Sequence, residues 1–181
     1  MNGEDAGDVS SSVAESPNDT ARLLDVRGER GKLVVGKHVW SNTRKEFRQI
    51  FGQIASDVVM FQLWRVYGGA MVKELFPRRG IDDDDSDRLE TLRAILLGLA
   101  ETNGWGNATA ELKEATNEIS LDLADCTFCE KSTSDKPVCF EMSGLLAGFS
   151  ENISGKKVSV SEIRCIAKGD KTCSFTIRFM T

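Results

Sequence analysis

The chain has 181 residues, of which 40% are hydrophobic and 28% are charged, so it is long enough to bury a core and ordinary for a globular protein. Its formal net charge is -5, because its 28 acidic residues exceed its 23 basic residues by the five acidic residues that lie within residues 1–20. The remainder is neutral, and no apolar run approaches the roughly 20 residues that a membrane span requires. With no basic stripe in the sequence, we expect neither direct nucleic-acid binding nor a membrane span.

Residues 1–20, MNGEDAGDVSSSVAESPNDT, are acidic, rich in serine and poor in large apolar residues. Such a segment cannot bury enough apolar surface to offset the entropy of ordering. We therefore expect a disordered acidic tail, followed by a single domain over residues 21–181. The N-terminus lacks a basic region followed by an apolar stretch, which predicts a cytoplasmic protein with reduced cysteines.

The first helical pattern follows Ser41, a residue suited to cap a helix, and its apolar spacing continues to Phe76. Gly52 interrupts the pattern, so we expect a break into two helices near residues 52–56. Because apolar residues occur on so many sides of this segment, we expect it to be buried at the centre of the fold.

A further helix is expected from the spacing of the apolar residues between Leu89 and Leu99, with Gly104 just past its end. Four aspartates at 82–85 precede this helix. They lack the alternating ligands, central glycine and distal glutamate of an EF-hand loop. We interpret them as the acidic start of a helix and not as a calcium site.

After this helix the apolar period changes to two. The segments WGNATAEL and EISLDLAD predict a hairpin that turns at residues 115–117. A helix is then expected over residues 137–150, in which Gly144 and Gly148 let another backbone approach closely.

The last two segments, 156–167 and 172–179, predict a second hairpin. Two hairpins separated by one helix, after the N-terminal helices, indicate an α+β fold.

The second hairpin carries a glutamate and two cysteines. Cys173 alternates with the apolar residues of the last strand and therefore faces the core. On the preceding strand the apolar residues change parity, which predicts a β-bulge near Glu162 and Ile163 that puts Glu162 and Cys165 on the same side. A three-residue loop over residues 168–170 would make Cys165 and Cys173 cross-strand neighbours.

A core-facing glutamate is costly unless a positive charge lies beside it, and zinc would supply that charge. Glu162, Cys165 and Cys173 are three of the four ligands of a closed tetrahedral site, and Cys139, at the start of the 137–150 helix, is the candidate fourth. The alternative is that the cysteines are small core residues or a facultative disulfide, and that the glutamate reaches solvent. The spacing E-x2-C-x7-C leaves both interpretations open.

Cys126 and Cys129 form a C-x2-C motif and are rival metal ligands. Such a motif can serve zinc, an iron–sulfur cluster or thiol redox chemistry. Thioredoxin-like chemistry needs the pair at the start of a helix in a βαβ unit, whereas this pair ends a strand of a hairpin, which argues against redox catalysis. An all-cysteine site that excludes Glu162 stays open.

The order of these motifs resembles the 4-vinyl reductase domain family, a group of proposed hydrocarbon-binding proteins. The motifs are C-x2-C, PVCF, a helix carrying GLLAG, a strand ending in E-x2-C, and A-x-GD-x2-C-x-F. The upstream segment TRKEFRQIFGQIASDVVMFQLWRVYGGAMVKEL and the strand opening with GWG are also similar, so the resemblance covers about residues 22–181. It implies a fold shared with small TRAPP vesicle-tethering subunits, in which helices pack on a twisted four-stranded antiparallel sheet, often as a homodimer.

The resemblance also implies a metal and a ligand. In the phenol-sensing activators that carry this domain, three cysteines and a glutamate hold zinc, and the matching positions are Cys139, Glu162, Cys165 and Cys173. A small hydrophobic or aromatic molecule is expected in a pocket between helices and sheet. The phenol sensors bind the hydroxyl group with a histidine and a tryptophan, but the only histidine here is His38, ahead of the long helices, so phenol itself is not expected.

Trp64, Tyr67 and Trp105 are the candidate pocket residues, and ordinary core positions are the alternative. We therefore expect a non-enzymatic, sensor-type domain that holds a structural zinc, binds a hydrophobic small molecule and signals through a partner or through dimer geometry. The alternatives are a TRAPP-like scaffold or assembly subunit and, ranked last, an accessory protein of a reductase that uses the C-x2-C pair. No nucleotide loop, flavin fingerprint or acid–base pair in the sequence indicates catalysis.

Overall fold

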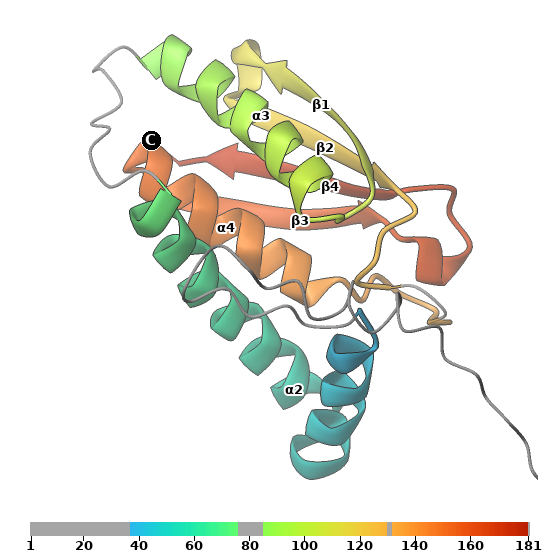
Figure 1. The fold of residues 1–181 in the computed structure, drawn as a ribbon. Coiled ribbons are helices and arrows are strands. Elements are labelled where there is room, and N and C mark those ends of the chain that lie inside the picture. The colour runs from blue at the N-terminus through green and yellow to red at the C-terminus, as the bar shows by residue number, and fades with distance from the viewer. Residues whose placement is uncertain (1–36, 76–84, 130–131, 181) are drawn as a thin grey trace, which may run out of the picture. The chain divides into compact units, whose positions relative to one another are not determined.

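The computed structural model describes residues 37–75, 85–129 and 132–180, which belong to one compact unit over Gly36–Thr181 (Figure 1). The expected acidic tail at 1–20, the side chain of His38 and most of the aspartate run at 82–85 lie outside the described residues.

The elements appear in the order expected for an α+β fold, which confirms that prediction (Figure 1). The helices and strands are α2 (Lys37–Leu75), α3 (Asp85–Thr102), β1 (Asn107–Lys113), β2 (Glu118–Ala124), α4 (Phe140–Ser154), β3 (Val158–Arg164) and β4 (Cys173–Phe179). The four strands form one antiparallel sheet in the order β1-β2-β4-β3. Both predicted hairpins are therefore present, and they join through the β2–β4 pair.

Alternation along the strands creates the face on which the helices pack. In β2, the side chains of Ile119, Leu121 and Leu123 are all fully buried, as the period-two pattern predicts. Helix α3 packs on β1 and α4 packs mainly on β3, so the two helices cover one face of the sheet (Figure 1). Every residue from 141 to 150 in α4 is buried, because α2 covers the side of α4 that faces away from the sheet.

Helix α2 contains a sharp bend at Gly52, where the backbone has φ 74° and ψ 168°. A side chain at this positive φ would be strained, and glycine adopts it freely. The bend divides α2 into an N-terminal arm, residues 37–51, and a C-terminal arm, residues 53–75 (Figure 1). Across the bend, Arg48 donates a 3.0 Å hydrogen bond to Asp57. The predicted break near residues 52–56 is therefore confirmed.

Glycines allow α2 and α4 to pack with their backbones in contact. A Cβ atom added at Gly144 would collide with the carbonyl oxygen of Phe61, and one added at Gly148 would collide with that of Arg65. The close approach predicted for these two glycines of α4 is confirmed. An ion pair fastens the same contact, because Arg65 donates two hydrogen bonds of 2.8 Å to Glu151.

The expectation that the whole of α2 is buried is wrong. Only one narrow stripe of its C-terminal arm, which includes Met60, Trp64 and Val72, packs into the core. A single helix can offer only one side to one partner helix, so its other apolar sides lie on the surface of the monomer. The exposed apolar surface of α2 comprises Ile50, Phe51, Ile54, Val58, Val59, Leu63, Val66, Tyr67 and Leu75. Among the helices that the structure describes, none is long and apolar enough to cross a membrane.

Candidate metal centre

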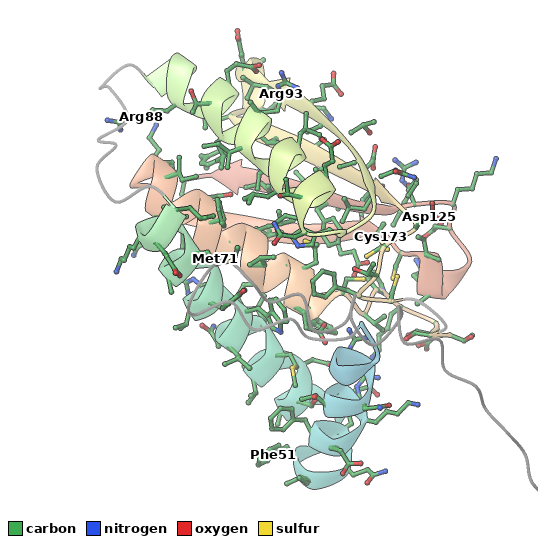
Figure 2. The ribbon with its side chains drawn as sticks, viewed as in Figure 1. Phe51, Met71, Arg88, Arg93, Asp125 and Cys173 are labelled. Carbon is green, nitrogen blue, oxygen red and sulfur yellow. The ribbon has the colours of Figure 1, made fainter. Side chains whose placement is uncertain are left out.

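All five cysteines and Glu162 converge at the end of the sheet where β2 ends and β4 begins. Sulfur atoms gather beside the labelled Cys173 in Figure 2. The five thiols are free and buried, and each is at most 1% exposed. We call these six side chains the cysteine cluster; they are Cys126, Cys129, Cys139, Glu162, Cys165 and Cys173.

Each member of the cysteine cluster is positioned by a distinct local feature. Cys126 and Cys129 lie in the turn that follows β2. Cys139 is the N-cap residue of α4, where the helix N-terminus favours a thiolate. Glu162 lies at the shift in β3–β4 register between residues 162 and 164, which confirms the predicted bulge.

The connection between the two C-terminal strands differs from the three-residue loop expected at 168–170. Strand β3 ends at Arg164, and a 3-10 helix, Ile166–Lys168, occupies the connection. The cause is local hydrogen bonding: Asp170 accepts a 2.8 Å hydrogen bond from the backbone N–H of Cys165, and Gly169 adopts a left-handed φ of 98°. Cys165 therefore lies beyond the strand, yet its sulfur stays within 4.8 Å of that of Cys173.

The distances between sulfur atoms suit a tetrahedral metal ion. Cys139 Sγ lies 4.0 Å from Cys126 Sγ, 4.0 Å from Cys165 Sγ and 3.8 Å from Cys173 Sγ. A tetrahedron with zinc–sulfur bonds of about 2.3 Å has an edge of about 3.8 Å. Thiolates and a carboxylate are ligands that zinc accepts, so these residues fit that ion.

Glu162 is buried without a positively charged partner. Its Oε2 accepts a 2.9 Å hydrogen bond from the backbone N–H of Cys139, whereas its Oε1 is buried and has no hydrogen-bond partner. Burial raises the pKa of Glu162 to about 8. Such a carboxylate is costly to bury alone, and a bound cation would offset that cost.

The structure brings together both the predicted ligand set and its rivals. Two groups of four have all their ligand atoms within 4.8 Å of one another. One is the predicted set, Cys139, Glu162, Cys165 and Cys173; the other is the all-cysteine set, Cys126, Cys129, Cys139 and Cys173. Hydrogen bonds from Cys129 and Cys139 lower the pKa of the Cys126 thiol, so the cluster favours thiolate at that position.

A buried ion pair beside the cluster is not evident in the sequence. Arg44, on the N-terminal arm of α2, is 5% exposed and donates from Nε to Glu141 at 2.8 Å. Its Nη2 donates to the carbonyl oxygen of Phe128 at 2.9 Å. Burial opposes the charge on Arg44, but Glu141 and the nearby thiolates of Cys139 and Cys129 raise its pKa. Spacing gave no signal for this pair, because its partners are 97 residues apart.

The candidate pocket aromatics lie around the C-x2-C turn. The ring of Phe128, inside that motif, meets Trp64 edge-on with centroids 5.3 Å apart, and Trp64 meets Tyr67 in the same way at 5.3 Å. Trp105 accepts a 3.2 Å hydrogen bond at its carbonyl oxygen from the N–H of Thr127. Trp64 and Trp105 are buried, but Tyr67 is 51% exposed and is therefore not a core residue.

A surface depression of about 410 Å³ lies apart from these aromatics, on the N-terminal arm of α2. Asn42, Thr43, Glu46, Phe47 and Ile50 line it.

The family model of the 4-vinyl reductase domain matches residues 119–179, the stretch from β2 to β4 that contains the whole cysteine cluster. This chain contains a 4-vinyl reductase domain. The match confirms the resemblance found in the order of the sequence motifs.

Two curated relatives of this 4-vinyl reductase domain chain are uncharacterized proteins of Methanocaldococcus jannaschii. One is 38% identical over 64 residues, which cover 35% of this chain and 35% of the relative. The other is 26% identical over 157 residues, which cover 85% of this chain and 67% of the relative. The chain thus spans only about a third of the first relative's length.

Three solved structures share the fold. The phenol-responsive sensory domain of the transcription activator PoxR, solved with phenol, has a TM-score of 0.65 at 16% identity and covers 82% of this chain and 76% of its own. Trafficking protein particle complex subunit 3 from Naegleria fowleri, covalently bound to palmitic acid, has 0.63 at 13% identity, with coverage of 80% and 93%. A vinyl-4-reductase family protein from Methanocaldococcus jannaschii has 0.53 at 15%, with 84% and 85%.

Proposed function

We propose that the chain is a non-enzymatic, sensor-type domain that binds a small hydrophobic or aromatic molecule and is held together by a structural zinc site. The observation that carries the proposal is the contact of one turn, residues 126–129, with both arms of α2. Arg44 bonds the carbonyl oxygen of Phe128 from one arm, and Trp64 packs on its ring from the other. A metal that fixes this turn therefore also fixes the long helix.

Zinc is proposed at Cys139, Glu162, Cys165 and Cys173, whose buried donor atoms fit it. Zinc bound by four protein ligands supplies cross-linking and not chemistry, since no position remains for water. These residues come from the start of α4 and from both strands of the second hairpin, so the ion would fasten that helix to the sheet. Ligation needs reduced cysteines, in keeping with a cytoplasmic location.

The ligand is proposed to contact Trp64, Tyr67 and Trp105. Aromatic rings bind flat apolar molecules through large contact areas with little loss of side-chain entropy. The structures of PoxR and of the Naegleria subunit were solved with phenol and with palmitic acid, and they support a hydrophobic ligand class for this fold. Ligand contact at Trp64 would reach the turn at Phe128 through one ring contact.

A homodimer is proposed through the exposed apolar surface of α2. Ile54 is 83% exposed and Val66 is 72% exposed, far above what a core helix shows. A contiguous apolar surface of this kind marks an interaction site, and a second copy of the chain offers the same surface. A ligand that shifts α2 would then change the geometry of the dimer.

Assembly is the second candidate function. The exposed surface of α2 and the fold shared with the trafficking subunit favour a scaffold or assembly subunit. A role as a reductase accessory protein has less support, because Cys126 and Cys129 are 1% and 0% exposed and a partner thiol could not reach them.

A ligand screen on the full chain separates sensor from scaffold. Thermal shift is measured against a panel of monocyclic aromatics and medium-chain fatty acids, and organic extracts of the purified protein are analysed for retained molecules. A sensor domain gives a saturable rise in melting temperature with at least one compound, and this rise is reduced in Trp64→Ala but kept in Ile54→Ala, a control on the exposed side. No rise with any compound and no extractable molecule would support the scaffold instead.

A further inference from the structure

The two four-residue groups of the cysteine cluster share two members. Both contain Cys139 and Cys173; one adds Cys126 and Cys129, and the other adds Glu162 and Cys165. Two tetrahedra that share two corners share an edge, and a thiolate can bridge two metal ions at such a corner. From this arrangement we infer that the cluster holds two zinc ions, with Cys139 and Cys173 as bridging thiolates. The inference rests on the structural zinc of the proposed function and adds a second metal to it.

The shared edge has the length that this arrangement needs. Cys139 Sγ and Cys173 Sγ are 3.8 Å apart, which matches the tetrahedral edge of about 3.8 Å for zinc–sulfur bonds. The edges from Cys139 to Cys126 on one side and to Cys165 on the other are both 4.0 Å. The 3.2 Å separation of Cys129 and Cys173 must widen by about 0.6 Å on loading. One sulfur thus stands at tetrahedral distance from donors of both groups.

A single zinc leaves buried donors unexplained in either group. An ion held by the four cysteines alone leaves Glu162 with a buried Oε1 that has no partner. An ion held by the group that contains Glu162 leaves Cys126 and Cys129 as extra thiols, buried to 1% and 0% exposure against the ligands. Two ions use all six donors, with four ligands each.

The charges around the cluster suit two ions better than none or one. Five thiolates and one carboxylate carry six negative charges, and two divalent ions offset four of them. The guanidinium of Arg44 is buried beside the cluster and interacts with Cys139 and Cys129. The N-terminus of α4 and the backbone N–H of Ile166, which donates to Cys173 Sγ at 3.4 Å, further stabilise negative sulfur.

The test measures metal per chain on the full protein, purified under reducing conditions without added metal. Elemental analysis is expected to give two zinc ions per chain. After exchange with cadmium-113, NMR is expected to show two signals that split each other, because coupling passes through bridging thiolates. A single zinc with a single cadmium signal overturns the inference and leaves the proposed structural zinc intact. No bound metal overturns both, and a brown iron–sulfur chromophore overturns the assignment to zinc.

Variants identify the two positions independently. The double variant Cys126→Ser with Cys129→Ser is expected to keep one zinc, and so is Glu162→Gln with Cys165→Ser; Ser132→Ala, in the same loop, serves as the control and keeps two. Circular dichroism shows whether each variant is folded. If a variant does not fold, the two coupled cadmium signals of the unmodified protein still decide the question. Equal zinc content in the control and both folded double variants contradicts the inference.

Discussion

Replacing Gly148 by alanine tests the close packing of α4 against α2. The added Cβ would collide with the carbonyl oxygen of Arg65 and lie 2.8 Å from its carbonyl carbon and 3.0 Å from the nitrogen of Gly69. These are backbone atoms, so the strain is relieved only if α2 moves away as a unit. Overpacking of this kind costs about 1–3 kcal/mol, part of which is offset by the higher helix propensity of alanine. We expect a net loss of about 2 kcal/mol in the free energy of unfolding.

Gly98 offers a matched control in α3. It is exposed, and a Cβ there meets nothing within 4 Å. Gly98→Ala is therefore expected to stabilise the protein by about 0.5–1 kcal/mol. For a domain of this size, about 1 kcal/mol moves the melting temperature by about 2–4 °C. Thermal unfolding followed by circular dichroism should thus show a fall of about 4–8 °C for Gly148→Ala and a rise for Gly98→Ala. Equal stabilisation by both changes would refute the close approach of the two helices.

Three further predictions concern the buried ion pair, the exposed surface and the metal. Arg44→Met leaves Glu141 buried without its partner and should lower the free energy of unfolding in urea by about 3–5 kcal/mol, whereas adding Glu141→Leu should recover most of the loss; an equal loss in both variants speaks against the pair. Ile54→Lys with Val66→Lys should halve the mass found by sedimentation equilibrium without lowering the melting temperature, and an unchanged mass argues for a dimer surface elsewhere. Chelation under reducing conditions should lower the melting temperature by about 8–16 °C if metal was present at about a thousand times its dissociation constant; an unchanged temperature contradicts a structural metal.

Sequence periodicity was sufficient to predict the elements because their signals are local. The strand alternation that ends in Cys173, the parity change at Glu162 and the glycine at position 52 each reflect backbone geometry within a few residues. These signals correctly predicted the second hairpin, the bulge and the bend of α2. Gly144 and Gly148 predicted the close helix contact in the same way, although not which helix would approach.

Features that depend on distant residues were beyond these signals. Apolar spacing in α2 suggested burial, but spacing does not say how many partner surfaces exist, and the monomer provides only one. Arg44 and Glu141 meet only after α2 folds back on α4, so neither residue stands out locally. Cys126 and Cys129 looked like competitors of Glu162, since spacing cannot show that two ligand groups share an edge.

The zinc content of the folded chain tests the central claim, that the cysteine cluster is a metal centre, most directly. Native mass spectrometry of the full protein, purified with reductant and without added metal, gives the mass of the folded species. We predict that nearly every folded chain carries zinc and that the metal is lost together with the fold on acidification, because the thiolate ligands become protonated. A compact chain that is metal-free in more than about half of the molecules would contradict the claim.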